Sequence, residues 1–217
     1  KINRLGYTFS IFALLFYNCA AIGPAGGGPK DKLGPKLISV YPLNGTTNLN
    51  LDQNIVITFS EPIDPNSVQA SIHINSDSTY KLTIRRNIIT LIPTALWNKD
   101  KNLRISIDRD IRDYQGNEME SPINLIYSPS PTLNFNKISG LLHNIENKKI
   151  YNIGLFKYSR KDSLKLIYKT QSSESGEFSF DYILKNKYVV IATNGNLENI
   201  YEEIKSQDYG IYTNEFI

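Results

Sequence analysis

The chain has 217 residues, of which 41% are hydrophobic and 21% are charged. This composition can build a core and excludes a wholly disordered protein. A single cysteine and two histidines exclude an internal disulfide and a zinc-finger framework. A mean hydropathy of −0.30 excludes a polytopic membrane protein. The length fits two compact domains of roughly 90 residues each, preceded by a leader.

The formal net charge of +3 comes from the start of the chain. Residues 1–35 carry 4 basic and 1 acidic side chains, residues 36–131 carry 9 and 10, and residues 132–217 carry 11 and 10. Nucleic-acid binding needs a concentrated basic surface. Because the two long segments are close to neutral, the sequence excludes nucleic-acid binding.

The first residues have the pattern of a secretory signal peptide. Lys1 and Arg4 precede an apolar run at 7–17, YTFSIFALLFY. As a helix, eleven residues rise about 16 Å, which is short of the roughly 30 Å needed to cross a bilayer. A basic start followed by a short apolar run indicates a signal peptide, which we assign to residues 1–18. Since residue 1 is not Met, we expect the natural chain to start upstream.

Cys19, the single cysteine, directly follows this apolar run. Bacterial lipoprotein signals place their lipidated cysteine at this position, and acyl chains can anchor a protein stably. Residues 16–18, FYN, depart from the usual residues before that cysteine, and an ordinary buried cysteine near a conventional cleavage site is the alternative. We predict lipidation of Cys19, followed by a Gly/Pro-rich tether over residues 19–35.

From residue 37 onward, short apolar alternations separated by turn residues predict β-strands. They occur at 55–59, 72–74, 82–84, 88–92 and 103–107. Strands of this length and spacing predict an all-β fold built as an antiparallel sandwich, which we place at residues 36–130. The segment PNSVQA, at 65–70, is expected to form one helical turn at most.

Several motifs in this part resemble known bacterial families. The sequence ITFSEPIDPNSV at 57–68 is similar to the signature of the S-layer-type bacterial Ig-like domain, and LRISIDRDIRDYQGNEM at 103–119 resembles its penultimate strand and D-x-x-G-N turn. Cys19 followed by PAGGGPKD and GPKLISVYPLNG resembles the start of lipoproteins of Bacteroidota bacteria. The resemblance implies lipid anchoring in the outer membrane, on its periplasmic or cell-surface face. An Ig-like fold alone implies little about activity.

A proline-containing segment at 129–131 predicts a boundary before a second β-domain at 131–195. The sequences ISGLLHNIENKKIYNIGLFKY and SGEFSFDYILKNKYVVIAT resemble the carboxypeptidase-regulatory-like, prealbumin-type β-sandwich, a module without peptidase chemistry. In that family Gly140 would start the first strand, and Gly176, Glu177 and Phe178 would follow the central turn. Residues 196–217 resemble the acidic loop and trailing strand that follow this module, and we expect the chain to continue beyond them.

The densest carboxylate group consists of Asp108, Asp110 and Asp113. Calcium prefers several oxygen ligands at set spacings, but Arg109 and Arg112 interrupt this group and the EF-hand spacing is absent. We therefore expect the Asp113 side chain to accept backbone hydrogen bonds in a turn, with calcium binding as the alternative.

A second calcium candidate consists of Asn194, Asn196 and Asn199. Related loops of the resembled family carry Asp at such positions, and Asn lowers the negative charge of a site. A short helix over 197–204 is the alternative. No metal ion and no cofactor are therefore predicted.

The remaining candidates indicate a protein without catalytic activity. His73 and His143 are expected to be solvated strand residues. They lie in different predicted domains, and the residue spacing around them does not support a Ser-His-Asp triad. Trp97 is expected in the core and not on a glycan-stacking surface. We predict an envelope lipoprotein that binds or scaffolds a protein partner, with a surface carbohydrate-binding module as the alternative.

Overall fold

The computed structural model describes residues 28–75, 78–134, 136–146, 148–159, 163–197, 200 and 209–212. The chain divides into two compact units, Lys1–Lys32 and Leu33–Ile217. The predicted signal peptide and the predicted lipidation site at Cys19 lie outside the described residues. Within the described part of the chain, no helix is both long enough and apolar enough to span a bilayer.

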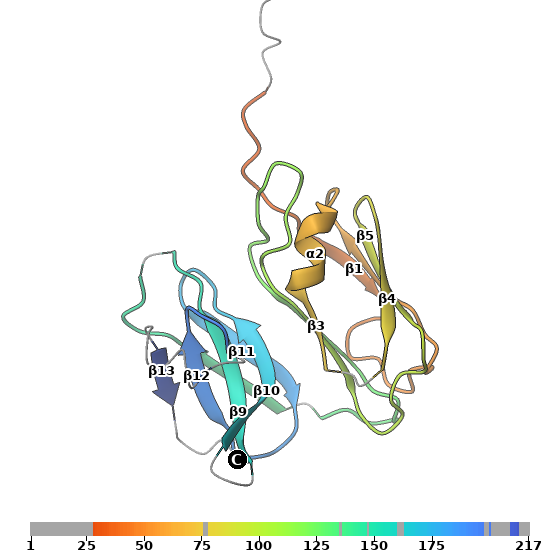
Figure 1. Cartoon of the computed structure of the whole chain (residues 1–217), viewed down its shortest axis with the longest axis vertical. Helices are drawn as coiled ribbons and strands as arrows, with labels where there is room; N and C mark the ends of the chain where they lie inside the picture. The colour runs from red at the N-terminus through yellow and green to blue at the C-terminus, as the bar shows by residue number, and fades with distance from the viewer. Residues whose placement is uncertain are drawn as a thin grey trace, which may run out of the picture. The chain divides into compact units, whose positions relative to one another are not determined.

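The first module, as we call strands β1 to β7, consists of two antiparallel sheets (Figure 1). The four-stranded sheet has the order β1 (Leu37–Tyr41), β2 (Ile55–Phe59), β5 (Ile88–Pro93) and β4 (Tyr80–Arg85), and the three-stranded sheet has the order β3 (Ile72–Ile74), β6 (Leu103–Ile107) and β7 (Ile123–Tyr127). Buried and half-buried residues alternate along β2, as expected for a strand with one face toward the core. Both sheets contribute to one apolar core.

The helix α2 (Pro65–Ser71) is longer than the single turn expected from the sequence. Its seven residues form nearly two turns. Asp64 caps its N-terminus, because the carboxylate accepts a hydrogen bond from the backbone N–H of Asn66 at 3.0 Å. Pro65 occupies the first helical position, where its fixed φ suits the helix and a missing N–H costs nothing. This local capping explains why the short segment is helical.

The second module, strands β8 to β13, also consists of two antiparallel sheets (Figure 1). The larger sheet has the order β10 (Ser163–Gln171), β9 (Asn152–Ser159), β12 (Val189–Thr193) and β13 (Tyr209–Tyr212), and the smaller one pairs β11 (Glu177–Ile183) with β8 (Asn136–Leu141). Every residue of β12 is buried, because the larger sheet has an apolar cluster on each face. The all-β fold of antiparallel sheets is therefore confirmed.

Candidate functional site: a polar joint between the modules

Strand β6 buries its polar side chains as well as its apolar ones. The sequence alternation predicts one apolar and one polar face, yet all five residues are buried. Arg104 and Ser106 are each only 6% exposed. The covering residues come from the second module, and both modules belong to the same compact unit. We call this contact the polar joint; it comprises Arg104, Ser106, Asp108, Arg109 and Asn124 with Tyr168, Lys169, Thr170, Gln171, Asp181 and Tyr182.

Arg104 makes the most extensive contact in the joint. Its Nη2 donates hydrogen bonds to the carbonyl oxygens of Asp181, at 3.0 Å, and Tyr182, at 2.9 Å. Its guanidinium carbon lies 4.5 Å from the ring centroid of Tyr168, within cation–π range. Burial lowers the pKa of Arg104, and the neighbouring Tyr168 and Asp181 partly offset that effect. An arginine nevertheless remains charged in proteins, so a buried cation joins the modules.

Asp108 is a buried anion of the joint, and its partners are Lys169 and His73. Its Oδ2 lies 3.1 Å from Nζ of Lys169, in the second module, and 2.8 Å from Nε2 of His73, in the first. The Asp108 side chain is 10% exposed, whereas that of His73 is 36% exposed. The expectation of a merely solvated His73 is therefore incomplete, because its ring is held by a buried carboxylate.

Amide and hydroxyl groups complete the joint. The backbone N–H of Arg109 donates to Oε1 of Gln171 at 2.7 Å, and Nδ2 of Asn124 donates to Oγ1 of Thr170 at 3.0 Å. The Arg109 side chain is buried, and its Nε donates to the carbonyl oxygen of Met119. Directional contacts of this kind fix the orientation of two surfaces more strictly than apolar packing does. The joint is thus suited to holding two modules at one angle.

The three carboxylates of the first calcium candidate have separate environments. Asp108 belongs to the joint, Asp110 is exposed, and Asp113 is 4% exposed in a turn. Among the described residues, the acidic group compact enough for a metal includes Asp113 but neither of the other two. Asp108 moreover faces two basic side chains, which is unfavourable for a cation site. The structure does not bring these three residues together.

Asp113 accepts the hydrogen bonds expected from its turn. Its Oδ1 accepts from the backbone N–H groups of Gln115, at 2.8 Å, and Asn117, at 2.9 Å, and its Oδ2 accepts from Nδ2 of Asn117. Burial alone would raise the pKa of Asp113, but the hydrogen bonds from Asn117, Gln115 and Gly116 outweigh it and lower the pKa. The sequence expectation for Asp113 is therefore confirmed.

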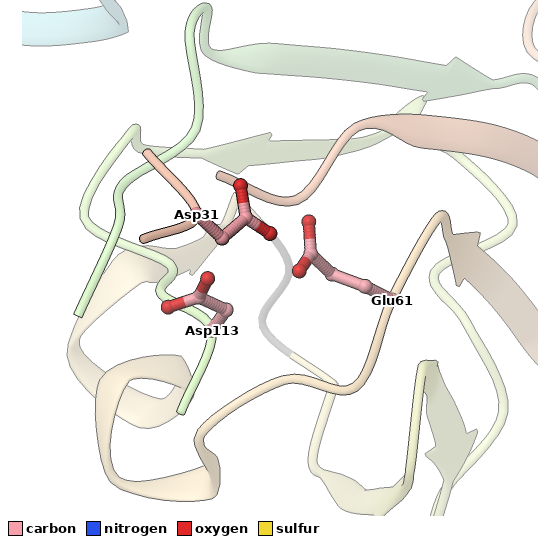
Figure 2. Close-up of side chains that lie close together, drawn as sticks. All are labelled: Asp31, Glu61 and Asp113. Carbon is pink, nitrogen blue, oxygen red and sulfur yellow. The ribbon is translucent and has the colours of Figure 1, made fainter. Parts of the chain in front are cut away.

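Glu61 lies close to Asp113, with carboxylate oxygens within 4.8 Å of each other (Figure 2). Asp31, also drawn in Figure 2, belongs to the separate unit Lys1–Lys32 and is not counted with this pair. Both oxygens of Asp113 already accept hydrogen bonds within its own turn. We assign no metal to this pair, because two carboxylates in a turn region commonly occur without one.

The second calcium candidate is only partly described. Asn194 is half-buried and its Oδ1 has no hydrogen-bond partner among the described residues, whereas Asn196 is exposed. Asn199 lies outside the described residues, as does most of the alternative helix at 197–204. This loop therefore stays an untested calcium candidate, with the short helix as its alternative.

Trp97 lies in the core, as expected. It is 2% exposed, and its Nε1 donates a hydrogen bond to the carbonyl oxygen of Gln53 at 2.8 Å. The face of the buried Trp97 ring is therefore not available to a ligand.

His143 is exposed, as expected, and lines a cavity of about 480 Å³ between β8 and strands β12 and β13.

Sequence reasoning missed the residues of the second module that form the joint. Lys169 and Gln171 were not candidates, although they contact Asp108 and Arg109. The available signal was the polar face of β6, where an arginine, a serine and the following aspartate alternate with core residues. In a chain predicted to have two modules, such a face is a candidate contact surface as well as a solvent face.

Residues 31–135 match the model of the family described as "Bacterial Ig-like domain". No curated protein matches the chain. The native alpha-2-macroglobulin of Escherichia coli, spanning domains MG0-NIE-MG1, is 12% identical, with a TM-score of 0.32 over 82% of this chain and 71% of that chain. L,D-transpeptidase 1 of Mycobacterium tuberculosis is 16% identical, with a TM-score of 0.27 over 62% and 78%. Neither likeness informs the function of this protein, whereas the family match shows that residues 31–135 are similar to a bacterial Ig-like domain.

Proposed function

We propose that this protein is a non-enzymatic envelope lipoprotein that binds or scaffolds a protein partner. The observation that carries the proposal is the polar joint, in which the buried ion pair between Asp108 and Lys169 spans the two modules. A protein that displays binding surfaces at a fixed spacing benefits from such a contact, because loosely linked modules lose orientational entropy on binding. The joint thus supports a scaffold in preference to two independent modules.

The anchor in this proposal is a lipid on Cys19, placed in the outer membrane. It is supported by the basic and apolar leader before Cys19 and by the Gly/Pro-rich segment after it. Such a segment would separate the folded modules from the membrane. The Ig-like domain agrees with a role in binding, since this fold presents edges and loops to partners and is not tied to one chemistry.

The proposed contact surface for the partner is the edge strand β1 and its continuation. This strand forms one edge of its sheet, and Ile38, Tyr41 and Leu43 are 63%, 65% and 74% exposed. Edge strands of soluble proteins are usually protected by charge or by covering segments. An exposed apolar edge favours strand pairing with another protein.

A surface carbohydrate-binding module remains the second candidate. Tyr41 and Tyr114 are 65% and 70% exposed, and exposed aromatic rings can stack on sugars. Trp97 does not support this candidate, because its side chain is buried.

Capture of partners from membranes tests the proposal. A chain tagged at the C-terminus is extracted in mild detergent, and co-purifying proteins are identified by mass spectrometry. We expect a stoichiometric envelope protein, its loss with Tyr41→Glu, and its retention with Lys81→Glu on the opposite edge strand. Recovery of the chain alone, with a known complex surviving the same extraction, would contradict the scaffold and direct attention to glycans. Separately, Cys19→Ala should release the protein from membranes, and its continued retention there would contradict the lipid anchor.

A further inference from the structure

Strand β11 is irregular at the point where it meets the first module. Its register with β8 shifts between Phe180 and Ile183, and Tyr182 has a φ of +57°. The left-handed region is unfavourable for a tyrosine. A bulge of this kind reorients the local backbone, and here it directs the carbonyl oxygens of Asp181 and Tyr182 toward one atom.

That atom is Nη2 of Arg104, which lies within 3.0 Å of both oxygens. In a regular strand, neighbouring carbonyls point to opposite sides, so one donor could not reach both. Arg104 comes from β6, whose strand partners β3 and β7 both belong to the first module. The bulge of one module is therefore held by a charged donor from the other.

The same bulge contacts the first module at a second place. The hydroxyl oxygen of Tyr182 lies 3.3 Å from the position that a Cβ on Gly45 would occupy. Gly45 itself has a φ of +85°, a conformation that glycine adopts easily. The backbone of Tyr182 thus contacts Arg104, while its side chain lies against a turn before β2.

We infer that the Arg104 contact couples the two modules, so that they unfold as one cooperative unit. Unfolding of the second module would remove both carbonyl acceptors and the Tyr168 ring from a buried guanidinium. Unfolding of the first would remove the donor that holds the bulge. Loss of charged hydrogen bonds in a buried place is unfavourable, so neither module is expected to open alone. The inference extends the proposed scaffold role, but it depends on neither the lipid nor the partner.

Urea unfolding of the detergent-extracted full chain tests this coupling. Trp97 is the single tryptophan and reports on the first module through its fluorescence. Hydrogen exchange of β9 and β12, followed by mass spectrometry, reports on the second. We expect coincident midpoints for the unmodified protein. With Arg104→Ala, the midpoint for the second module should fall below that of Trp97 by about 0.5–1 M urea.

A matched variant separates coupling from plain destabilisation. Leu91 is fully buried in the first core, and it lies outside the joint. Leu91→Ala should lower both midpoints together, because the Arg104 contact remains. Arg85→Ala, which removes an exposed arginine at the end of β4, should leave both midpoints unchanged.

Arg104→Lys covers the case in which the alanine variant does not fold. Lysine keeps the charge but lacks the planar group that stacks on Tyr168 while donating to both carbonyls, so a smaller separation of midpoints is expected. Separated midpoints in the unmodified protein would overturn the inference, as would coincident midpoints in the folded Arg104 variants. Either outcome would leave membrane anchoring and partner capture unaffected, so this failure is distinguishable from failure of the proposed function.

Discussion

Replacement of Asp113 by alanine should weaken the first module through a turn that lies outside the polar joint. The variant removes the acceptor of three hydrogen bonds, two from backbone N–H groups and one from Nδ2 of Asn117. A hydrogen bond to a charged group contributes about 1.5–3 kcal/mol. Gln115 is exposed and Asn117 is half-buried, so water replaces part of what is lost. We expect the free energy of unfolding to fall by about 2–4 kcal/mol.

The contribution of Asp113 to the free energy of unfolding should depend on pH, whereas a contribution from apolar packing alone would not. Hydrogen bonding holds the pKa of Asp113 in the folded protein below its ordinary value of 3.8. Its stabilising contribution is therefore fully present above that value and is lost as the pH falls through the lowered pKa. Asp113→Asn cannot titrate, so its stability should approach that of the unmodified protein as the solution is acidified below pH 3.8.

Urea unfolding followed by Trp97 fluorescence measures both effects. Asp110→Asn is the control, because Asp110 is exposed in the same segment and surface substitutions usually change stability by less than about 0.5 kcal/mol. An Asp113→Ala effect no larger than the Asp110→Asn effect would refute the role of the turn. A difference between Asp113→Asn and the unmodified protein that does not shrink on acidification would refute the lowered pKa.

Three further substitutions test other contacts. Trp97→Phe should lower the free energy of unfolding, measured by circular dichroism, by about 1–3 kcal/mol, because it removes side-chain volume and leaves the carbonyl oxygen of Gln53 without its donor. Any glycan binding should be unchanged. Loss of a glycan-array signal in the folded variant would contradict this expectation. Lys169→Met should lower the free energy of unfolding by about 1–3 kcal/mol, because the buried carboxylate of Asp108 loses one of its partners. Lys165→Met, at an exposed position of the same strand, should lower it little. Equal losses in the two variants would contradict a special role of the ion pair. Gly140→Ala places a Cβ 2.6 Å from an aromatic ring of β11 and should lower the thermal midpoint, unlike Gly210→Ala, which meets nothing within 4 Å.

Local patterns were sufficient to predict most strands of the first module. The alternation in Ile55–Phe59 matches its burial, because one face of β2 meets the core and the other does not. The helix Pro65–Ser71 was underestimated, although Asp64 before Pro65 is a recognisable start signal. In β12 the unbroken apolar run reflects burial on both faces. The local sequence around each of these elements therefore contains the signal that predicts it.

Local sequence predicts one of the two polar sites, the Asp113 turn, but not the other, the polar joint. The hydrogen bonds of Asp113 reach two and four residues along the chain, so the turn could be predicted from the segment itself. The joint could not, because Arg104 and the Asp181 carbonyl are 77 positions apart, and Asp108 and Lys169 are 61 apart. A polar strand face does not specify whether water or a distant segment covers it.

The charged and polar groups of the joint contribute more to a single orientation of the two modules than to their stability. Burying Arg104 and Asp108 requires that each charge lose water and find partners of good geometry, and the net gain over an apolar contact is small. Any rotation of one module against the other would separate these charges from their partners and leave them buried without compensation. An apolar joint of the same size would tolerate sliding, because its attraction has no direction. The polar residues of β6 therefore favour one orientation of the modules, which is the property that a scaffold requires.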